Sequence, residues 1–147
     1  LRAVQPEGSA AIAHAWAVGS DDATPVSGAH SVADSLTVEA PRNARLCLRQ
    51  VRDSGGGAVT VSDSDILAAI PTLASHCGVF AEPSAAATVA GLEAALAAGL
   101  VERKESVVLL VTGTGLKDVP AAAQAVSRPE AIEPSLDLVA RRLGLQA

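Results

Sequence analysis

One uninterrupted apolar run constrains the fold of this chain more than any other feature. Val107 to Val111 reads Val-Val-Leu-Leu-Val, with a polar residue before it and a glycine-rich turn after it. A short run of this kind suits a strand that is buried on both faces of a parallel sheet. The sequence therefore predicts an α/β fold in which other segments cover both faces of that strand.

Strand and helix patterns alternate along the rest of the chain. Further strands are expected at Leu1–Val4 and Ala58–Val61, with Val79–Ala81 extended. Helices are expected at 9–18 with Ser9 as N-cap, at 42–53, at 62–78 with Ser62 as N-cap and Pro71 inside, at 84–99, at 120–126 and at 135–144. This order predicts a three-layer α/β architecture, with a mainly parallel sheet between flanking helices.

Two segments interrupt the alternation. Residues 20–40 are polar and form a loop too long for an ordinary connection in a compact domain, and long loops are often functional. Residues 127–147 form a terminal helical segment that Pro129 and Pro134 break up. We expect residues 1–147 to belong to one domain.

Composition and charge exclude several classes of function. The chain has 147 residues, 49% of them hydrophobic, and a net charge of -5. Its 11 Lys and Arg residues are scattered without a basic stripe, which argues against a nucleic-acid partner. No apolar run approaches the roughly 18 residues needed to span a membrane. Cys47 and Cys77 are too few for a disulfide framework or a zinc site, so we expect two buried thiols in a cytoplasmic protein.

The turn after the apolar run is the best candidate site by position. Ligands of open α/β sheets bind at the carboxyl ends of strands, where Thr112–Asp118 is expected. Its two hydroxyls and two glycines would let a ligand come close to the backbone. A Thr-Gly-Thr-Gly stretch fits an ordinary turn equally well, and a phosphate-binding P-loop is excluded because its Gly-Lys-Ser/Thr end is absent.

The histidines offer weaker alternatives. His76 and Cys77 are neighbours on a predicted helix and point about 100° apart, which argues against a thiol–imidazole pair. His14 and His30 have no third ligand at metal-binding spacing. We therefore expect no metal site.

The turn, read together with the sequence Gly-Val-Phe-Ala-Glu-Pro-Ser-Ala-Ala-Ala at 78–87, resembles the threonine synthase family of pyridoxal-phosphate enzymes. Segments 33–36, 41–43, 48–56 and 58–63 agree with the same family. The likeness covers Val4 to Ala123, which corresponds to the latter part of a complete enzyme. Thr114 departs from the pattern, since His or Asn is common there. The resemblance implies the C-terminal portion of a tryptophan synthase β-subunit-like fold.

The resemblance also implies roles for individual residues. The Thr112 hydroxyl would face the ring nitrogen of pyridoxal 5'-phosphate, and Gly113 would shape the pocket. Gly8 and Ser9 would lie beside the ring, with Glu7 nearby. A hydroxyl does not hold the ring nitrogen protonated as a carboxylate does, which suits elimination and replacement better than transamination. Glu7 is equally compatible with a solvated residue at a strand end. The position of Glu82 before Pro83 favours a residue at the start of a helix over a catalytic acid.

The groups that such an enzyme needs for covalent cofactor binding are absent from the chain. Catalysis requires a lysine that forms a Schiff base and a glycine-rich turn for the phosphate. The two lysines do not fit, since Lys104 lies in the charged stretch 102–105 and Lys117 in the downstream turn. We therefore expect no catalytic residue here, a missing N-terminal half that supplies these groups, and no activity from the chain alone.

The intact enzyme would act on a small amino-acid substrate. The expected reaction converts O-phospho-L-homoserine and water to L-threonine and phosphate. Threonine dehydratase and cysteate synthase share the motifs and remain alternatives, as does a non-catalytic α/β binding module. An apolar face that the missing half would cover predicts self-association, and we expect a homo-oligomer.

Overall fold

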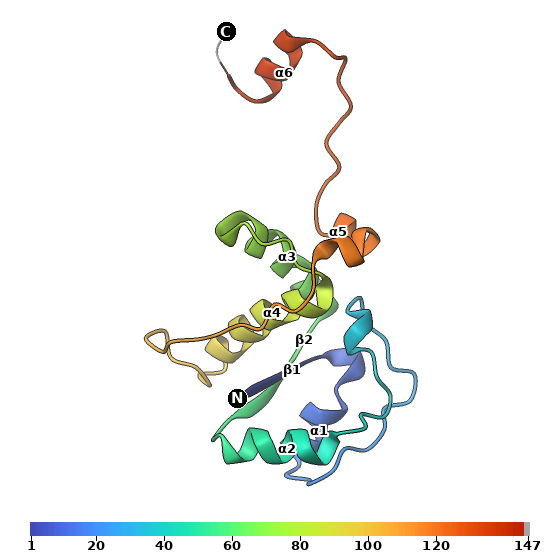
Figure 1. The fold of residues 1–147 in the computed structure, drawn as a ribbon, viewed down its shortest axis with the longest axis vertical. Coiled ribbons are helices and arrows are strands. Elements are labelled where there is room, and N and C mark those ends of the chain that lie inside the picture. Colours follow the sequence, from blue (N-terminus) through green and yellow to red (C-terminus); the bar gives the residue numbers. More distant parts are fainter. Residues whose placement is uncertain (146–147) are drawn as a thin grey trace.

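A two-stranded parallel sheet forms the middle layer of the computed structural model, which describes residues 1–145. Strand β1 (Arg2–Pro6) pairs with β2 (Gly57–Val61) in a register that sets Arg2 opposite Gly57. Helices α1 (Ala11–Ala17) and α2 (Ala44–Asp53) lie on one side of the sheet, and α3 (Asp63–Cys77) and α4 (Pro83–Ala97) on the other (Figure 1). The predicted three-layer α/β architecture is confirmed.

Small side chains bring α4 into close contact with the sheet. Ala86, Ala87 and Ala90 are buried against α3 and the strands. Gly91 faces β1 so closely that a Cβ at this position would overlap the side chain of Val4. An alanine-rich helix with a single inward glycine therefore sets the distance between this layer and the sheet.

Local signals in the sequence explain where α3 begins and ends. Ser62 and Asp65 form a capping box, in which the Ser62 hydroxyl accepts from the Asp65 backbone N–H at 3.1 Å. The helix continues through Pro71 and ends at Gly78, whose φ of 68° is left-handed. Cys77 at this end is exposed and Cys47 is half-buried, so the prediction of two buried thiols is wrong.

Helix α2 carries a row of arginines on its solvent side. Its buried face consists of Ala44, Leu48 and Val51, while Arg45, Arg49 and Arg52 surround a shallow polar hollow. The expectation of scattered basic residues is thus wrong locally, because the helical period brings residues three and four apart together. Acidic residues of the preceding loop partly neutralise the row.

Two ion pairs join the long loop to α2. Arg52 pairs with Asp21 at 2.6 Å and lies 5.8 Å from the ring centre of Trp16. Arg45 donates to Asp22 at 2.8 Å, and this hydrogen bond, followed by one from the Ala23 N–H, lowers the pKa of Asp22 below its ordinary value of 3.8.

The most strongly expected strand, Val107–Val111, is not formed. The segment is extended and runs along α4, but it pairs with no strand among residues 1–145 (Figure 1). Val108 and Leu110 remain 84% and 70% exposed. An apolar hollow of about 230 Å³ separates the segment from β1. The side chains suit a strand buried on both faces, but a strand also needs backbone partners, and the described part of the chain offers none here.

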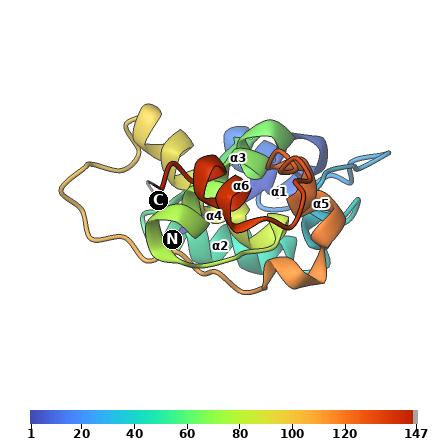
Figure 2. The same cartoon turned by 90° about the horizontal axis from the view of Figure 1, so that it is seen from above.

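The chain leaves the three layers in two places. The loop after α4 projects outward before the chain returns along that helix (Figures 1 and 2). Beyond α5 (Val119–Gln124), an extended linker leads to α6 (Leu136–Arg142), which stands apart and has no buried residue (Figure 1). Within the predicted terminal segment 127–147, helix covers only α6, and residues 146–147 lie outside the described range.

Candidate functional site

The carboxyl end of β1 is closed by the long loop that follows α1. A short 3₁₀ turn, η1 (Glu7–Ser9), follows β1, and the carbonyl of Gly8 accepts from the His30 backbone N–H at 3.1 Å. A Cβ at Gly8 would overlap the His30 backbone. Glycine is therefore required at this point for a steric reason, independently of any ligand.

Ser9 is fully buried and binds the same loop. Its hydroxyl accepts from the Val38 N–H at 2.9 Å and donates to the carbonyl of Leu36 at 3.0 Å. The side chain therefore does not cap α1, whose N-cap position is Ala10. The N-cap prediction is wrong because the loop carbonyls and N–H groups, distant in sequence, compete successfully for this hydroxyl.

The loop also reaches the exit of β2. Ser31 donates to the Asp63 carboxylate at 2.6 Å, and the Val32 N–H donates to the same carboxylate at 3.1 Å. Asp63 is the first residue of α3 and is separated from the end of β2 only by Ser62. Residues 30–38 thus cover the carboxyl ends of both strands, which is the edge where α/β folds place ligands.

The predicted glycine turn is joined to the segment before α4. The Glu82 N–H donates to the Gly113 carbonyl at 3.1 Å, and the Gly115 N–H donates to the Phe80 carbonyl at 2.9 Å. Ala81 and Thr114 form the antiparallel bridge between these bonds. The two motifs that carried the family resemblance are therefore neighbours in space.

Glu82 and Lys117 form an ion pair at this junction. The Nζ of Lys117 lies 2.9 Å and 3.1 Å from the two carboxylate oxygens of Glu82. The Glu82 side chain is only 8% exposed, whereas that of Lys117 is 58% exposed. Glu82 occupies the N-cap position of α4 but makes no capping hydrogen bond with its side chain, so its carboxylate is committed to the turn.

A cleft of about 290 Å³ lies between the long loop and the glycine turn. Asp34 and Ser35, from the short 3₁₀ turn η2 (Asp34–Leu36), line one side, and Glu82, Lys117 and Asp118 line the other. Because Leu36 also contacts Ser9, η2 lies between the β1 exit and the glycine turn. The candidate site is therefore an edge made of three segments distant in sequence.

The predicted site residues occupy different parts of this edge. Gly8 and Ser9 lie under the loop, Glu7 is exposed, and Gly113 packs against Glu82. Thr112 is exposed, and no hydrogen bond among residues 1–145 uses its hydroxyl. No hydrogen bond in that range joins Thr112 to η1 either. A hydroxyl without a protein partner, beside a glycine, is able to bind a polar ligand atom.

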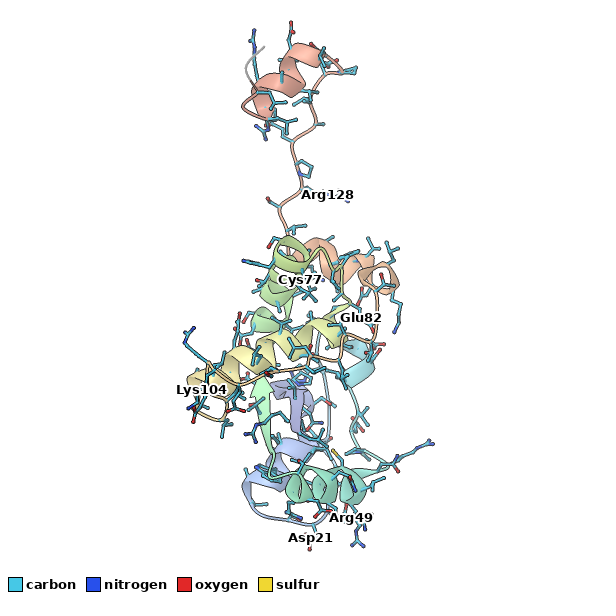
Figure 3. All side chains as sticks on the ribbon, turned by 60° about the vertical axis from the view of Figure 1, so that its left-hand side comes forward. Asp21, Arg49, Cys77, Glu82, Lys104 and Arg128 are labelled. Carbon is cyan, nitrogen blue, oxygen red and sulfur yellow. The ribbon has the colours of Figure 1, made fainter. Side chains whose placement is uncertain are left out.

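Sequence reasoning did not identify Glu82 and Lys117 as partners. The only available signal was that Lys117 and Glu82 belong to the two motifs of the resemblance, 35 positions apart. Lys104, at the opposite end of α4 from Glu82 (Figure 3), is 84% exposed and pairs with Glu102 at 2.9 Å. Each lysine is therefore paired with a glutamate and more than half exposed, unlike an amine enclosed in a pocket.

Across residues 1–145, no group of three or more His, Cys, Asp or Glu side chains could hold a metal ion. None of the helices described for this chain is long and apolar enough to cross a membrane.

Comparison with known proteins decides the family. Residues 1–113 match the family described as Pyridoxal-phosphate dependent enzyme. The chain belongs to this family. Among curated members it is similar to threonine synthase from Methanocaldococcus jannaschii, with 34% identity over 97% of this chain, and to threonine synthase from Methanosarcina acetivorans, with 35% identity over 95%. The matched regions form 35% and 34% of those two proteins and lie in their C-terminal parts.

Solved structures agree on the fold of this pyridoxal-phosphate dependent enzyme chain. Threonine deaminase isoform 2 from Solanum lycopersicum superposes with a TM-score of 0.63 at 22% identity, covering 84% of this chain and 34% of that one. A second threonine deaminase, from another organism, gives a TM-score of 0.52 at 21% identity, covering 67% of this chain and 33% of that one. At these identities the likeness concerns the fold alone.

Proposed function

We propose that this chain is the C-terminal part of a threonine synthase, which converts O-phospho-L-homoserine and water to L-threonine and phosphate. The main support is that curated threonine synthases match nearly the whole chain at 34–35% identity. The chain spans about a third of their length, so the reaction is proposed for the full-length protein. The two free thiols favour a reducing compartment, and we propose the cytoplasm.

In this proposal the Thr112 hydroxyl binds the ring nitrogen of pyridoxal 5'-phosphate. The cofactor, when bound, withdraws electrons from the bonds at the substrate α-carbon. Thr112 would orient the ring without holding its nitrogen protonated, and Gly113 would leave room beside it. Gly8, Ser9 and Glu7 would lie beside the ring at the β1 exit. The fit is supported by the exposed Thr112 hydroxyl and its location in the turn that Glu82 holds.

A threonine deaminase, also called threonine dehydratase, is the second candidate, and the structural neighbours favour it. Both reactions break a bond at the β- or γ-carbon of an amino acid with the same cofactor. We rank it below threonine synthase because the neighbours share only 21–22% identity.

The test is an assay of the purified full-length protein with pyridoxal 5'-phosphate. We expect equal amounts of phosphate and L-threonine to form from O-phospho-L-homoserine. Ammonia release from L-threonine, without phosphate release from O-phospho-L-homoserine, would instead assign the deaminase reaction. A protein that binds no pyridoxal 5'-phosphate and turns over neither substrate would support a non-catalytic module.

We also infer that residues 1–147 alone are inactive and bind the cofactor to no lysine. Lys117 is paired with buried Glu82, and Lys104 is paired with Glu102. Neither amine is therefore free to form a Schiff base with the aldehyde of the cofactor. Treatment of the chain with pyridoxal 5'-phosphate and borohydride, followed by mass spectrometry of peptides, checks this. A stoichiometric adduct at Lys117, with turnover of an amino acid, would contradict it.

A further inference from the structure

The Glu82 carboxylate is the one buried acidic side chain that the proposed chemistry leaves without a role, among residues 1–145. It is 8% exposed and lies at the start of α4, where its own backbone N–H donates to the Gly113 carbonyl at 3.1 Å. A carboxylate at such a site needs compensating partners, because its burial is costly. Lys117 supplies the compensating charge from the far end of the same turn.

The Glu82 side chain is in direct contact with the Gly113 backbone. A Cβ at Gly113 would overlap the Glu82 carboxylate, so the side chain lies directly against the Gly113 Cα. Phe80 supports Gly115 in the same way, since a Cβ there would overlap its ring. The turn between Thr112 and Lys117 is thus fixed on one side by a charged side chain and on the other by an aromatic ring.

We propose that Glu82 and Lys117 are positioning residues, which hold the Gly113 backbone and thereby aim the Thr112 hydroxyl at the cofactor ring. This inference rests on the proposed function, because it concerns the direction of a ligand contact. Glu82 does not touch the ring in this account. It acts through Gly113, and the ion pair acts on Thr112 only by fixing the residue that follows it.

The exposed pair Glu102–Lys104 provides a matched comparison. Its Nζ–carboxylate distance is 2.9 Å, equal to the shorter distance in the Glu82–Lys117 pair, but both of its side chains are more than half exposed. Exposed pairs contribute little because water and salt screen them. Substitutions there control for the removal of a charge alone.

The experiment measures the dissociation constant of pyridoxal 5'-phosphate and the absorption band of the bound cofactor in the full-length protein. Glu82→Gln and Lys117→Met are each expected to weaken binding about tenfold and to move the band, because the turn loses its anchor. Lys117→Arg should bind the cofactor within about twofold of the unaltered protein, since the positive charge remains. Glu102→Gln and Lys104→Met should leave both quantities unchanged.

A double-substitution cycle tests whether the pair acts through Thr112. In a Thr112→Val background, Glu82→Gln should add less than about twofold, because the contact that it positions is already gone. Equal effects in both backgrounds, or no effect of Glu82→Gln and Lys117→Met in the unaltered background, would overturn the positioning role alone. If Lys117→Met folds and Glu82→Gln does not, the first variant decides.

Failure of the proposed function gives a different pattern. If the unaltered full-length protein binds no pyridoxal 5'-phosphate, both proposals fall together. If it binds the cofactor but Thr112→Val leaves binding and the absorption band unchanged, the role of Thr112 and this inference fall, while the reaction is still decided by phosphate and L-threonine release. If Thr112→Val weakens binding while the two positioning variants do not, the proposed function stands and only this inference is wrong.

Discussion

Thr112 is the residue whose chemistry most directly tests the placement of the candidate site. Its exposed hydroxyl has no partner in residues 1–145. In the full-length protein Thr112→Ser should be nearly silent, because the hydroxyl remains. On the proposed placement of the cofactor, Thr112→Val keeps the shape and leaves the ring nitrogen unpaired, at a cost of about 1–3 kcal/mol, which should appear as weaker cofactor retention and slower turnover.

The opposite substitution separates electronic from steric effects at the same position. Thr112→Asp should hold the ring nitrogen protonated and favour side reactions such as transamination. Product analysis by mass spectrometry measures this partition. Full activity with an unchanged cofactor spectrum in Thr112→Val would remove this turn from the active site.

Asp22 offers a prediction that is independent of the cofactor. Arg45 and the Ala23 N–H stabilise its charged form, so the folded-state pKa lies below 3.8. The pair therefore stabilises the fold above pH 3.8, and this contribution is lost as the pH falls through the folded-state pKa. Since Asp22 is exposed, the effect on stability is small.

Carbon-13 NMR of the Asp22 carboxyl group measures this pKa. In Arg45→Met the titration midpoint should rise toward 3.8, while Arg49→Met, which removes a neighbouring charge on α2 but no bond to Asp22, should shift it less. An unchanged midpoint in Arg45→Met would show that the ion pair does not persist in solution.

At the scale of elements, α4 depends on the absence of a side chain at Gly91. Gly91→Ala gains up to about 1 kcal/mol of helix propensity, but the added Cβ would overlap Val4, and overpacking of this kind costs about 1–3 kcal/mol. We therefore expect a net loss in the free energy of unfolding, measured by urea denaturation.

Two comparisons isolate the steric cause. Adding Val4→Ala to Gly91→Ala should recover part of the loss, because it clears the overlap. Glu93 is exposed on the same helix. The difference in stability between Glu93→Ala and Glu93→Gly therefore measures the helix propensity of alanine over glycine without a packing effect. If Gly91→Ala raises stability by the same amount as that comparison, α4 does not pack on β1 as described.

The expected and observed elements differ where the formation of an element depends on backbone pairing with a distant segment and not on its own side-chain pattern. Ser62, Asp65 and Gly78 delimit α3 through contacts within a few residues, which is why the sequence predicts this helix well. The strand at Val107–Val111 was expected from side chains alone. A strand exists only when neighbouring backbones supply hydrogen bonds, and that information lies outside the segment.

For the whole molecule, the same exposed segment predicts self-association. Val108 and Leu110 are largely exposed beside the apolar hollow against β1. Removing such apolar surface makes association less favourable, so Val108→Ser with Leu110→Ser should weaken self-association of the 147-residue chain about tenfold or more and reduce binding of a hydrophobic dye. Sedimentation velocity gives the association state.

Val18 is the control for this prediction. It is 79% exposed but lies at the end of α1, away from the hollow, and Val18→Ser should leave association unchanged. A chain that is monomeric at high concentration and binds no dye would show that the exposed segment does not drive contacts between copies.

Local sequence patterns account for most of the helices, for the capping box and the glycine end of α3, and for the motifs that identify the family. These depend on residues close together in the chain, such as the Ser62–Asp65 box, or on linear patterns. Three features could not be predicted and depend on the folded chain: Ser9 binds the long loop, Glu82 pairs with Lys117, and Val107–Val111 stays unpaired within residues 1–145. Each of these depends on a partner 27 or more positions away, or on the lack of one, and competition among distant partners is resolved only when the chain has folded.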